Sequence, residues 1–300
     1  MSHKYVIAGP SSQALAVQVS KLLGMPAIET EFKKFPDGEN YVRLKIEDED
    51  SLAGSEVFII QTTDFPQNDH LWELLYLISI SRRLQCEKVH AIVPYLAYSR
   101  QDKVFRQGEA VSAELILTMI EHAGATSFST IDIHAPSVLS ILSIPSYNLD
   151  AMPALAQHLN DVELVNPAVI SPDKGSRARS GQFAKLINAE LVEFDKSRDT
   201  ITGEISMDGD AKDADLQGRD VAIADDIIAT GGTMSAAISL AKKGGARKLY
   251  ALCTHPLLIK NACFRLFNAG VEDVIGTNTV SSQVSKVSVA PLIADHVVNL

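Results

Sequence analysis

Residues 221–233 read VAIADDIIATGGT, and this run constrains the fold of the chain more than any other segment. A short apolar stretch is followed by two adjacent carboxylates, Asp225 and Asp226, and then by a loop of small residues. Apolar residues recur at helical spacing from Met234 onward. The pattern predicts a buried strand, a tight loop and the start of a helix, which is the repeating unit of an α/β sheet.

The loop of this run has a composition that suits a phosphate group. Its residues are Thr230, Gly231, Gly232 and Thr233. A loop of this kind before a helix points backbone N–H groups and hydroxyls at one spot, where an anion binds well. Asp225 and Asp226 cannot bind phosphate themselves. They suit sugar hydroxyls, or a metal ion held between them and a ligand.

The rest of the chain alternates in the same way. Apolar runs at residues 57–61, 89–94 and 127–133 read as strands, with helical patterns between them. This alternation predicts mainly parallel sheets flanked by helices. A proline-bounded junction at 145–153 separates a second half with the same logic, including a helix expected at 181–188. Duplication of one α/β domain would explain the similarity of the halves. The strand, loop and proline pattern common to α/β proteins in general would explain it too. The polar segment from 195 to 220 predicts a flap or hairpin.

Bulk properties exclude several classes of protein. The net charge of −10 argues against a general nucleic-acid-binding surface, which would need a basic face. No apolar run approaches the length of a membrane span, and no signal peptide is recognisable. The three cysteines are scattered, which indicates reduced thiols. We therefore expect a cytoplasmic enzyme or binding protein of small ligands.

Five further motifs precede the 221–233 run. They are FPDGENYVRL at 35–44, PYLAYSRQDK at 94–103, TIDIHAP at 130–136, SPDKGSRARSGQFAK at 171–185 and FDKSRD at 194–199. Taken singly, they are compatible with turns, a polar loop and a packed histidine. In this order, all six motifs resemble those of the ribose-phosphate diphosphokinases, also called phosphoribosyl diphosphate synthetases. The 221–233 run alone also resembles type I phosphoribosyltransferases.

The resemblance implies a fold and an organisation. It implies two similar α/β domains of the type I phosphoribosyltransferase kind, with mainly parallel sheets flanked by helices. We expect an N-terminal domain at 1–148, to which the segment of about 287–300 returns, and a C-terminal domain at 149–286. Self-association to at least a homodimer is implied as well, because the family shares its ATP-site hairpin between subunits.

The resemblance also implies an activity: transfer of the β,γ-diphosphoryl group of ATP to the C1 hydroxyl of ribose 5-phosphate, with Mg²⁺ as cofactor. It assigns roles residue by residue. The candidates are Phe35, Asp37, Glu39, Arg100, Gln101 and Asp102 for ATP; Asp225, Asp226, Thr230, Gly231, Gly232 and Thr233 for ribose 5-phosphate; His134 and Asp173, with Asp132 as a further candidate, for the metal; and Lys196 and Arg198 for catalysis.

Some positions depart from the commonest form of these motifs. Lys174 and Ser176 change the S-P-D turn, and Ala229 stands where the common bacterial form has aspartate. The loop at 105–110 is closer to archaeal-type members. Two alternatives stay open: a phosphoribosyltransferase that consumes phosphoribosyl diphosphate, and a regulatory paralogue of the synthetase without turnover.

Overall fold

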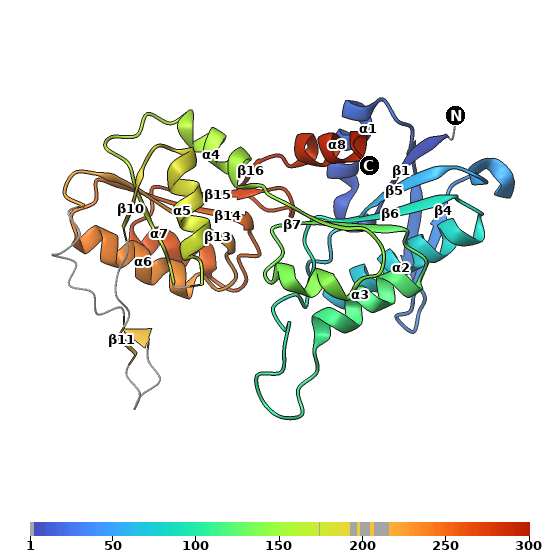
Figure 1. Ribbon diagram of the computed structural model, residues 1–300, viewed down its shortest axis with the longest axis horizontal. Helices are drawn as coiled ribbons and strands as arrows, with labels where there is room; N and C mark the ends of the chain where they lie inside the picture. Colours follow the sequence, from blue (N-terminus) through green and yellow to red (C-terminus); the bar gives the residue numbers. More distant parts are fainter. Residues whose placement is uncertain (1–2, 174, 193–196, 199–204, 207–215) are drawn as a thin grey trace. The chain divides into compact units, whose positions relative to one another are not determined.

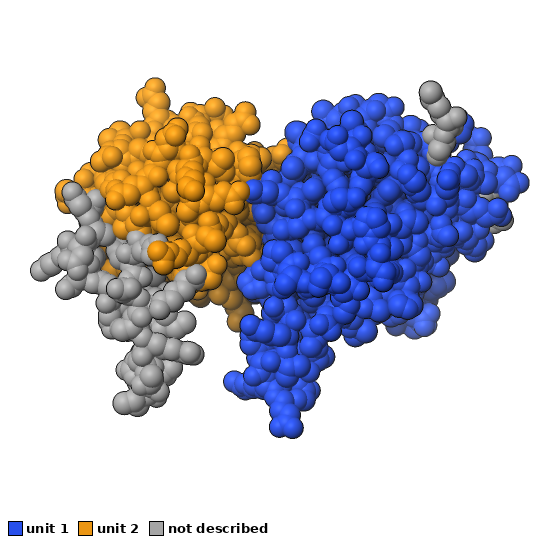
Figure 2. Space-filling model, in the orientation of Figure 1, with its two compact units in different colours: residues 1–150, 289–300 blue, residues 151–288 orange. Residues whose placement is uncertain are grey.

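The computed structural model describes all residues except 1–2, 174, 193–196, 199–204 and 207–215. The chain divides into two compact units, coloured separately in Figure 2. Unit 1 comprises residues 1–150 and 289–300, and unit 2 comprises residues 151–288. Each unit contains one six-stranded sheet with helices on its faces (Figure 1).

The main sheet of unit 1 has six strands, all in parallel pairs. Its strands are β1 (Lys4–Ala8), β2 (Ala27–Ile28), β5 (Glu56–Ile60), β6 (Lys88–Val93), β7 (Ser127–Ile131) and β8 (Ser146–Leu149). Its α-helices are α1 (Gln13–Leu23), α2 (Gln67–Arg83), α3 (Ser112–His122) and α8 (Ala290–Val298), with short 3-10 turns η1 (Pro10–Ser12), η2 (Glu49–Leu52) and η3 (Pro136–Ile141). Figure 1 shows α1 and α8 on one side of this sheet and α2 and α3 on the other.

The main sheet of unit 2 is again parallel and six-stranded. Its strands are β9 (Ala168–Ile170), β10 (Glu190–Val192), β13 (Asp220–Ile227), β14 (Lys248–His255), β15 (Asp273–Thr277) and β16 (Ser285–Val287). Its helices are α4 (Met152–Asn160), α5 (Arg177–Leu186), α6 (Gly232–Lys243) and α7 (Ala262–Ala269). The pair β11 (Ser197–Arg198) and β12 (Ile205–Ser206) forms a separate antiparallel ladder.

The two sheets have the same strand order. In unit 1 it is β2-β1-β5-β6-β7-β8, and in unit 2 it is β10-β9-β13-β14-β15-β16. The strand β5 therefore occupies in unit 1 the place that β13 occupies in unit 2. This correspondence confirms the expectation of two similar α/β domains with parallel sheets. It also favours duplication of one domain, over the pattern common to α/β proteins in general, as the reason why the two halves of the sequence look alike.

Burial follows from the sequence of the central strands. All five residues of β5 are buried, as are the first five of β13, because both faces of a parallel sheet are covered by helices. Such strands read as continuous apolar runs instead of alternating ones. No helix in the described part of the chain is long and apolar enough to cross a membrane.

Two further features of unit 1 are a hairpin outside its main sheet and a helix from the end of the chain. The hairpin of β3 (Thr30–Lys34) and β4 (Asn40–Leu44) carries the PDG turn, in which Gly38 has a φ of +97°. The helix α8 returns from the end of the chain to pack against α1. A hydrogen bond of 2.7 Å joins His296 Nε2 on α8 to Ser129 Oγ on β7, and the His296 ring lies 4.8 Å from that of Tyr147.

Candidate active site

The carboxyl end of β13 holds two acids that share one arginine. Arg179, in the first turns of α5, places Nη1 3.3 Å from Asp225 Oδ1 and 3.2 Å from Asp226 Oδ1. Asp226 is buried and Asp225 is half-buried. Since the carboxyl ends of strands are where open parallel sheets bind ligands, this acid pair lies at the expected edge of the unit 2 sheet.

Burial, followed by the neighbouring Asp226 carboxylate, raises the pKa of Asp225 to about 7, and Arg179 opposes part of the rise. Near neutral pH, Asp225 is therefore close to the midpoint of its titration. A carboxyl group with such a pKa in a polar edge of the sheet is typical of a functional site.

Asp173 and Ser176 extend this cluster from the preceding loop. Asp173 Oδ1 accepts hydrogen bonds from the Ser176 N–H at 2.8 Å and from the Ser176 hydroxyl at 2.9 Å. Ser176 Oγ also lies 3.2 Å from Asp225 Oδ1. The hydroxyl has one proton, so it donates to one of the two carboxylates at a time. The loop before α5 is thus tied to the acids of β13.

Arg179 and Ser176 were not among the site residues expected from the sequence. Both lie in the SPDKGSRARSGQFAK motif, so the motif marked the segment but not these two side chains. Their contact with Asp225 spans more than 40 residues of sequence. One sequence signal could have found Arg179. The 171–185 motif contains two arginines, and the adjacent acids Asp225 and Asp226 have no cation next to them in the sequence.

The loop after the acid pair has the geometry of an anion cradle. Gly231 has a φ of +71°, and α6 begins at Gly232. The first N–H groups of a helix have no acceptor within the helix, so they are available to a ligand. Thr230 and Thr233 are exposed beside them. The loop is held by backbone hydrogen bonds from the segment after β14, including Ile259 N–H to the Ala229 carbonyl at 3.0 Å.

The metal candidates divide between the units. Asp173 belongs to unit 2, whereas Asp132 and His134 belong to unit 1. Asp132 is buried with a φ of +40°, and His134 is exposed. Within the described residues, no group of three or more His, Cys, Asp or Glu side chains is arranged to hold a metal ion. The carboxylates of Asp173 and Asp225 are nonetheless hard oxygen donors that fit Mg²⁺, which keeps water or phosphate oxygens as its other ligands.

In unit 1, a pocket of about 500 Å³ gathers two of the expected ATP residues, Arg100 and Gln101. Its other lining residues are Gln67, Tyr95, Ala97, Tyr98, Phe105 and Glu109. Tyr98 has a φ of +66°, a strained conformation for an aromatic residue, and such strain is common at ligand sites. The Glu109 carboxylate accepts hydrogen bonds from the N–H groups of Phe105 and Arg106 at 3.0 and 2.8 Å, which orders the loop at the rim of the pocket.

Other expected ATP residues do not line this pocket. Asp102 follows Gln101 and is half-buried. Phe35, Asp37 and Glu39 lie on the β3–β4 hairpin, where Phe35 is 45% exposed and its ring packs edge-on against Tyr41 at 5.9 Å. The Phe35 N–H donates to the Glu39 carbonyl at 2.8 Å, which closes the turn.

The two expected catalytic cations are described least. Lys196 lies outside the described residues. Of Arg198 the structure describes only the backbone, which pairs with Ile205 in the β11–β12 ladder. Lys174, a departure from the usual motif, also lies outside the described residues.

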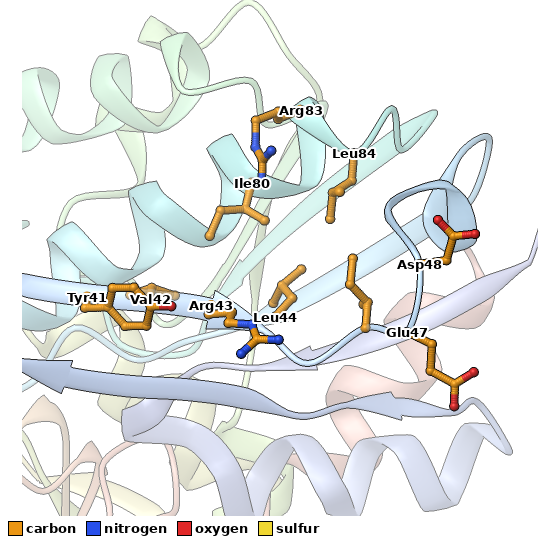
Figure 3. Close-up of a pocket in the computed structure, with 10 residues that line it drawn as sticks. Tyr41, Val42, Arg43, Leu44, Glu47, Asp48, Ile80, Arg83 and Leu84 are labelled. Carbon is orange, nitrogen blue, oxygen red and sulfur yellow. The ribbon is translucent and has the colours of Figure 1, made fainter.

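A second pocket of unit 1 has a different location. It measures about 380 Å³ and lies between β4 and the C-terminal part of α2 (Figure 3). Leu44 and Leu84 contribute apolar surface, and Arg43 and Arg83 contribute charge. None of the described site candidates lines it.

Comparisons with known proteins cover nearly the whole chain. Residues 4–124 match the family described as the N-terminal domain of ribose phosphate pyrophosphokinase, and residues 137–268 match the phosphoribosyl transferase domain. The chain is 39% identical over 290 residues to the ribose-phosphate pyrophosphokinase of Methanothermobacter thermautotrophicus, covering 97% of this chain and 98% of that protein. It is 35% identical over 301 residues to the enzyme of that name from Staphylococcus aureus, covering 96% and 91%.

A solved structure agrees with these relatives. The phosphoribosylpyrophosphate synthetase of Mycobacterium smegmatis superposes with a TM-score of 0.86 at 28% identity, covering 99% of this chain and 98% of that one. The two family matches together span both units, and so do the archaeal and bacterial relatives and the solved structure. The chain therefore belongs to the ribose-phosphate pyrophosphokinase family.

Proposed function

We propose that the protein transfers the β,γ-diphosphoryl group of Mg-ATP to the C1 hydroxyl of ribose 5-phosphate, yielding phosphoribosyl diphosphate and AMP. The observation that carries the proposal is the acid pair Asp225–Asp226 followed by an anion cradle, in a chain related along its whole length to ribose-phosphate pyrophosphokinases. A ligand with vicinal hydroxyls and a phosphate matches both halves of that arrangement.

In this proposal, unit 2 binds ribose 5-phosphate. The N–H groups of the loop 230–233, with the Thr230 and Thr233 hydroxyls, hold the 5-phosphate. Asp225 and Asp226 accept hydrogen bonds from the ribose hydroxyls, and Arg179 keeps the pair in position. Charged acceptors form stronger hydrogen bonds than neutral ones, so the ionised acid pair orients the C1 hydroxyl best.

Unit 1 binds ATP through the pocket that Arg100 and Gln101 line. Both side chains are planar and form paired hydrogen bonds, so they recognise an adenine edge or phosphate oxygens. Gln101 is preoriented, because its Oε1 accepts a hydrogen bond from Ser112 Oγ at 3.1 Å. Phe35, Asp37 and Glu39 complete the nucleotide site from the hairpin of a partner copy.

The chemical step is an in-line displacement. The C1 oxygen forms a bond to the β-phosphorus, the bond between that phosphorus and the α,β-bridging oxygen breaks, and AMP leaves. The proton of the C1 hydroxyl is released to solvent or to a nearby carboxylate. Asp173 of unit 2 and His134 of unit 1 are the candidate residues that would hold Mg²⁺, which would supply positive charge for the diphosphoryl oxygens. Lys196 and Arg198 add charge from the segment that follows β10.

The decisive test measures AMP release from ATP and ribose 5-phosphate in the presence of magnesium. We expect AMP and phosphoribosyl diphosphate in equal amounts, and no product without ribose 5-phosphate. A folded protein that forms no AMP would exclude the proposal and leave the regulatory paralogue. Release of diphosphate from phosphoribosyl diphosphate on addition of a purine base would instead identify a phosphoribosyltransferase.

A separate variant tests the cationic segment. Lys196→Ala should lower kcat by orders of magnitude, because charge on the transferring group goes uncompensated, while the affinity for ATP stays close to wild type. Unchanged kcat would remove Lys196 from the catalytic assignment.

The proposal includes self-association to at least a homodimer, which the shared nucleotide site requires. Light scattering coupled to size-exclusion chromatography should give a mass of at least twice 32.5 kDa. A monomer with full AMP-forming activity would exclude a nucleotide site that depends on a partner copy.

A further inference from the structure

The helix α7 lies against the glycine pair of the loop 230–233. A Cβ carried by residue 231 would lie 3.4 Å from Leu266 Cδ2 and 3.5 Å from the Ala262 carbonyl. Ala262 and Leu266 are fully buried and four residues apart, so they form one face of α7. These distances are those of ordinary van der Waals contact, so this face of α7 lies directly against the loop 230–233.

Arg265 lies on the neighbouring position of the same helical turn. A Cβ carried by residue 232 would lie 3.8 Å from Arg265 Nη1 and equally far from Thr230 Oγ1. The guanidinium group is thus positioned over Gly232, at the point where α6 begins. Arg265 is an exposed residue, so its position does not result from burial.

No acid neutralises this guanidinium within the described part of the chain. Arg265 has no hydrogen bond or ion pair there beyond its backbone N–H, which donates to the Asn261 carbonyl. Arg179, by contrast, is engaged by both Asp225 and Asp226. The loop itself contains only neutral residues, so the cradle has N–H groups and hydroxyls but no cation of its own.

The backbone before α7 is held in an unusual conformation that fixes this geometry. Leu258 and Lys260 have φ values of +43° and +57°. Left-handed conformations are unfavourable for non-glycine residues. They persist because the N–H groups of Leu258 and Ile259 donate to the carbonyls of Ile228 and Ala229, at 2.9 and 3.0 Å. The start of α7 is therefore locked to the loop that carries the cradle.

We infer that Arg265 is a substrate-binding residue whose guanidinium contacts the 5-phosphate of ribose 5-phosphate. The inference rests on the proposed function for the nature of the ligand and adds a residue to that site. An arginine can donate two parallel hydrogen bonds to a phosphate, which a lysine cannot reproduce. Arg265 supplies the full positive charge that the helix N-terminus provides only in part.

Kinetics of three variants test the inference. Arg265→Ala should raise the KM for ribose 5-phosphate ~10- to 100-fold, the usual loss for a hydrogen bond to a charged group. The KM for ATP should stay within about twofold of wild type, since the nucleotide binds elsewhere. The KM of Arg265→Lys for ribose 5-phosphate should lie between the values of the wild type and of Arg265→Ala. The matched control is Lys243→Ala, which removes an exposed cation at the other end of α6.

A binding experiment separates failure of the inference from failure of the proposed function. Ribose 5-phosphate and inorganic phosphate are titrated calorimetrically into wild type and Arg265→Ala without ATP. Weaker binding of both ligands by the variant supports the phosphate contact, whether or not the wild type forms AMP. Wild-type AMP formation with an unchanged KM for ribose 5-phosphate in Arg265→Ala would overturn the inference alone. Equal binding of both ligands by both proteins would overturn it as well.

Discussion

Replacing Asp225 by asparagine should make the protein more stable at alkaline pH while weakening ribose 5-phosphate binding. Burial and Asp226 raise the pKa of Asp225 to about 7 from an ordinary 3.8. Between these two values, the unfolded chain is ionised at residue 225 while the folded chain keeps the proton. The wild type therefore loses stability as the pH rises through this window, and above pH 7 the loss is complete.

The size of the effect follows from the shift. Each unit of pKa difference corresponds to ~1.4 kcal/mol, so the ionised Asp225 costs on the order of 4 kcal/mol at most at pH 8. Asparagine avoids this cost, and its Oδ1 can still accept the hydrogen bonds that Asp225 Oδ1 accepts from Arg179 and from the Asp226 N–H. For a protein of this size, 1 kcal/mol moves Tm by ~2–4 °C, so even a quarter of the full effect is measurable.

The assay is thermal unfolding between pH 4 and pH 8.5. The advantage of Asp225→Asn should be full above pH 7, decline as the pH falls and vanish near pH 4. Asp220→Asn is the matched control on the same strand. Asp220 accepts hydrogen bonds from Arg247 at 2.8 and 2.5 Å, so its loss should destabilise the protein at neutral pH. A gain for Asp225→Asn that does not change with pH, or a loss at pH 8, would refute the reasoning. In the enzymatic assay, the same variant should raise the KM for ribose 5-phosphate more than that for ATP.

Four further substitutions follow from the described contacts. Arg179→Met should move the acidic limb of the pH–rate profile upward by ~1 pH unit, because the cation that lowers the pKa of Asp225 is gone; a limb that stays in place would dissociate Arg179 from the titration. Gly231→Ala should cost ~1–2 kcal/mol in urea unfolding, since residue 231 has a φ of +71°, and a neutral effect would contradict the positive-φ requirement. Glu73→Gln should raise Tm at pH 8 but not near pH 4, because burial raises the pKa of Glu73 to about 7; equal Tm values at pH 8 would count against it. Gln101→Ala should raise the KM for ATP about tenfold and leave that for ribose 5-phosphate unchanged, and the reverse pattern would exclude Gln101 from the nucleotide site.

Much of the fold was predictable because its determinants are local. The strand at 221–227 and the loop at 230–233 are adjacent in sequence, and an apolar run followed by glycines predicts them without knowledge of the rest of the chain. The helix expected at 181–188 instead begins at Arg177. Its first turn is polar, since Arg179 faces the acid pair and not the core, so no apolar periodicity marked it.

The site was predictable only in part, because its geometry depends on contacts between distant segments. The motif at 171–185 gave Asp173 but not Ser176 or Arg179, whose roles arise when α5 packs beside β13. No sequence motif marked Arg265, because its contact with the loop 230–233 depends on the packing of α7 beside α6. Site residues that lie within one motif can be identified from the sequence. A cation on a neighbouring helix can be identified only once the packing of that helix is known.

The return of α8 to unit 1 has a consequence for how the chain is made. Residues 1–150 leave the ribosome well before the helix that covers the face of β7 carrying Ser129. Unit 2 is a single uninterrupted stretch, so all of its sheet is available before α8 is synthesised. During translation, the domain that is second in sequence is thus the first that can be completed. Until residues 290–298 are synthesised, α1 alone covers the face of the N-terminal sheet that it later shares with α8.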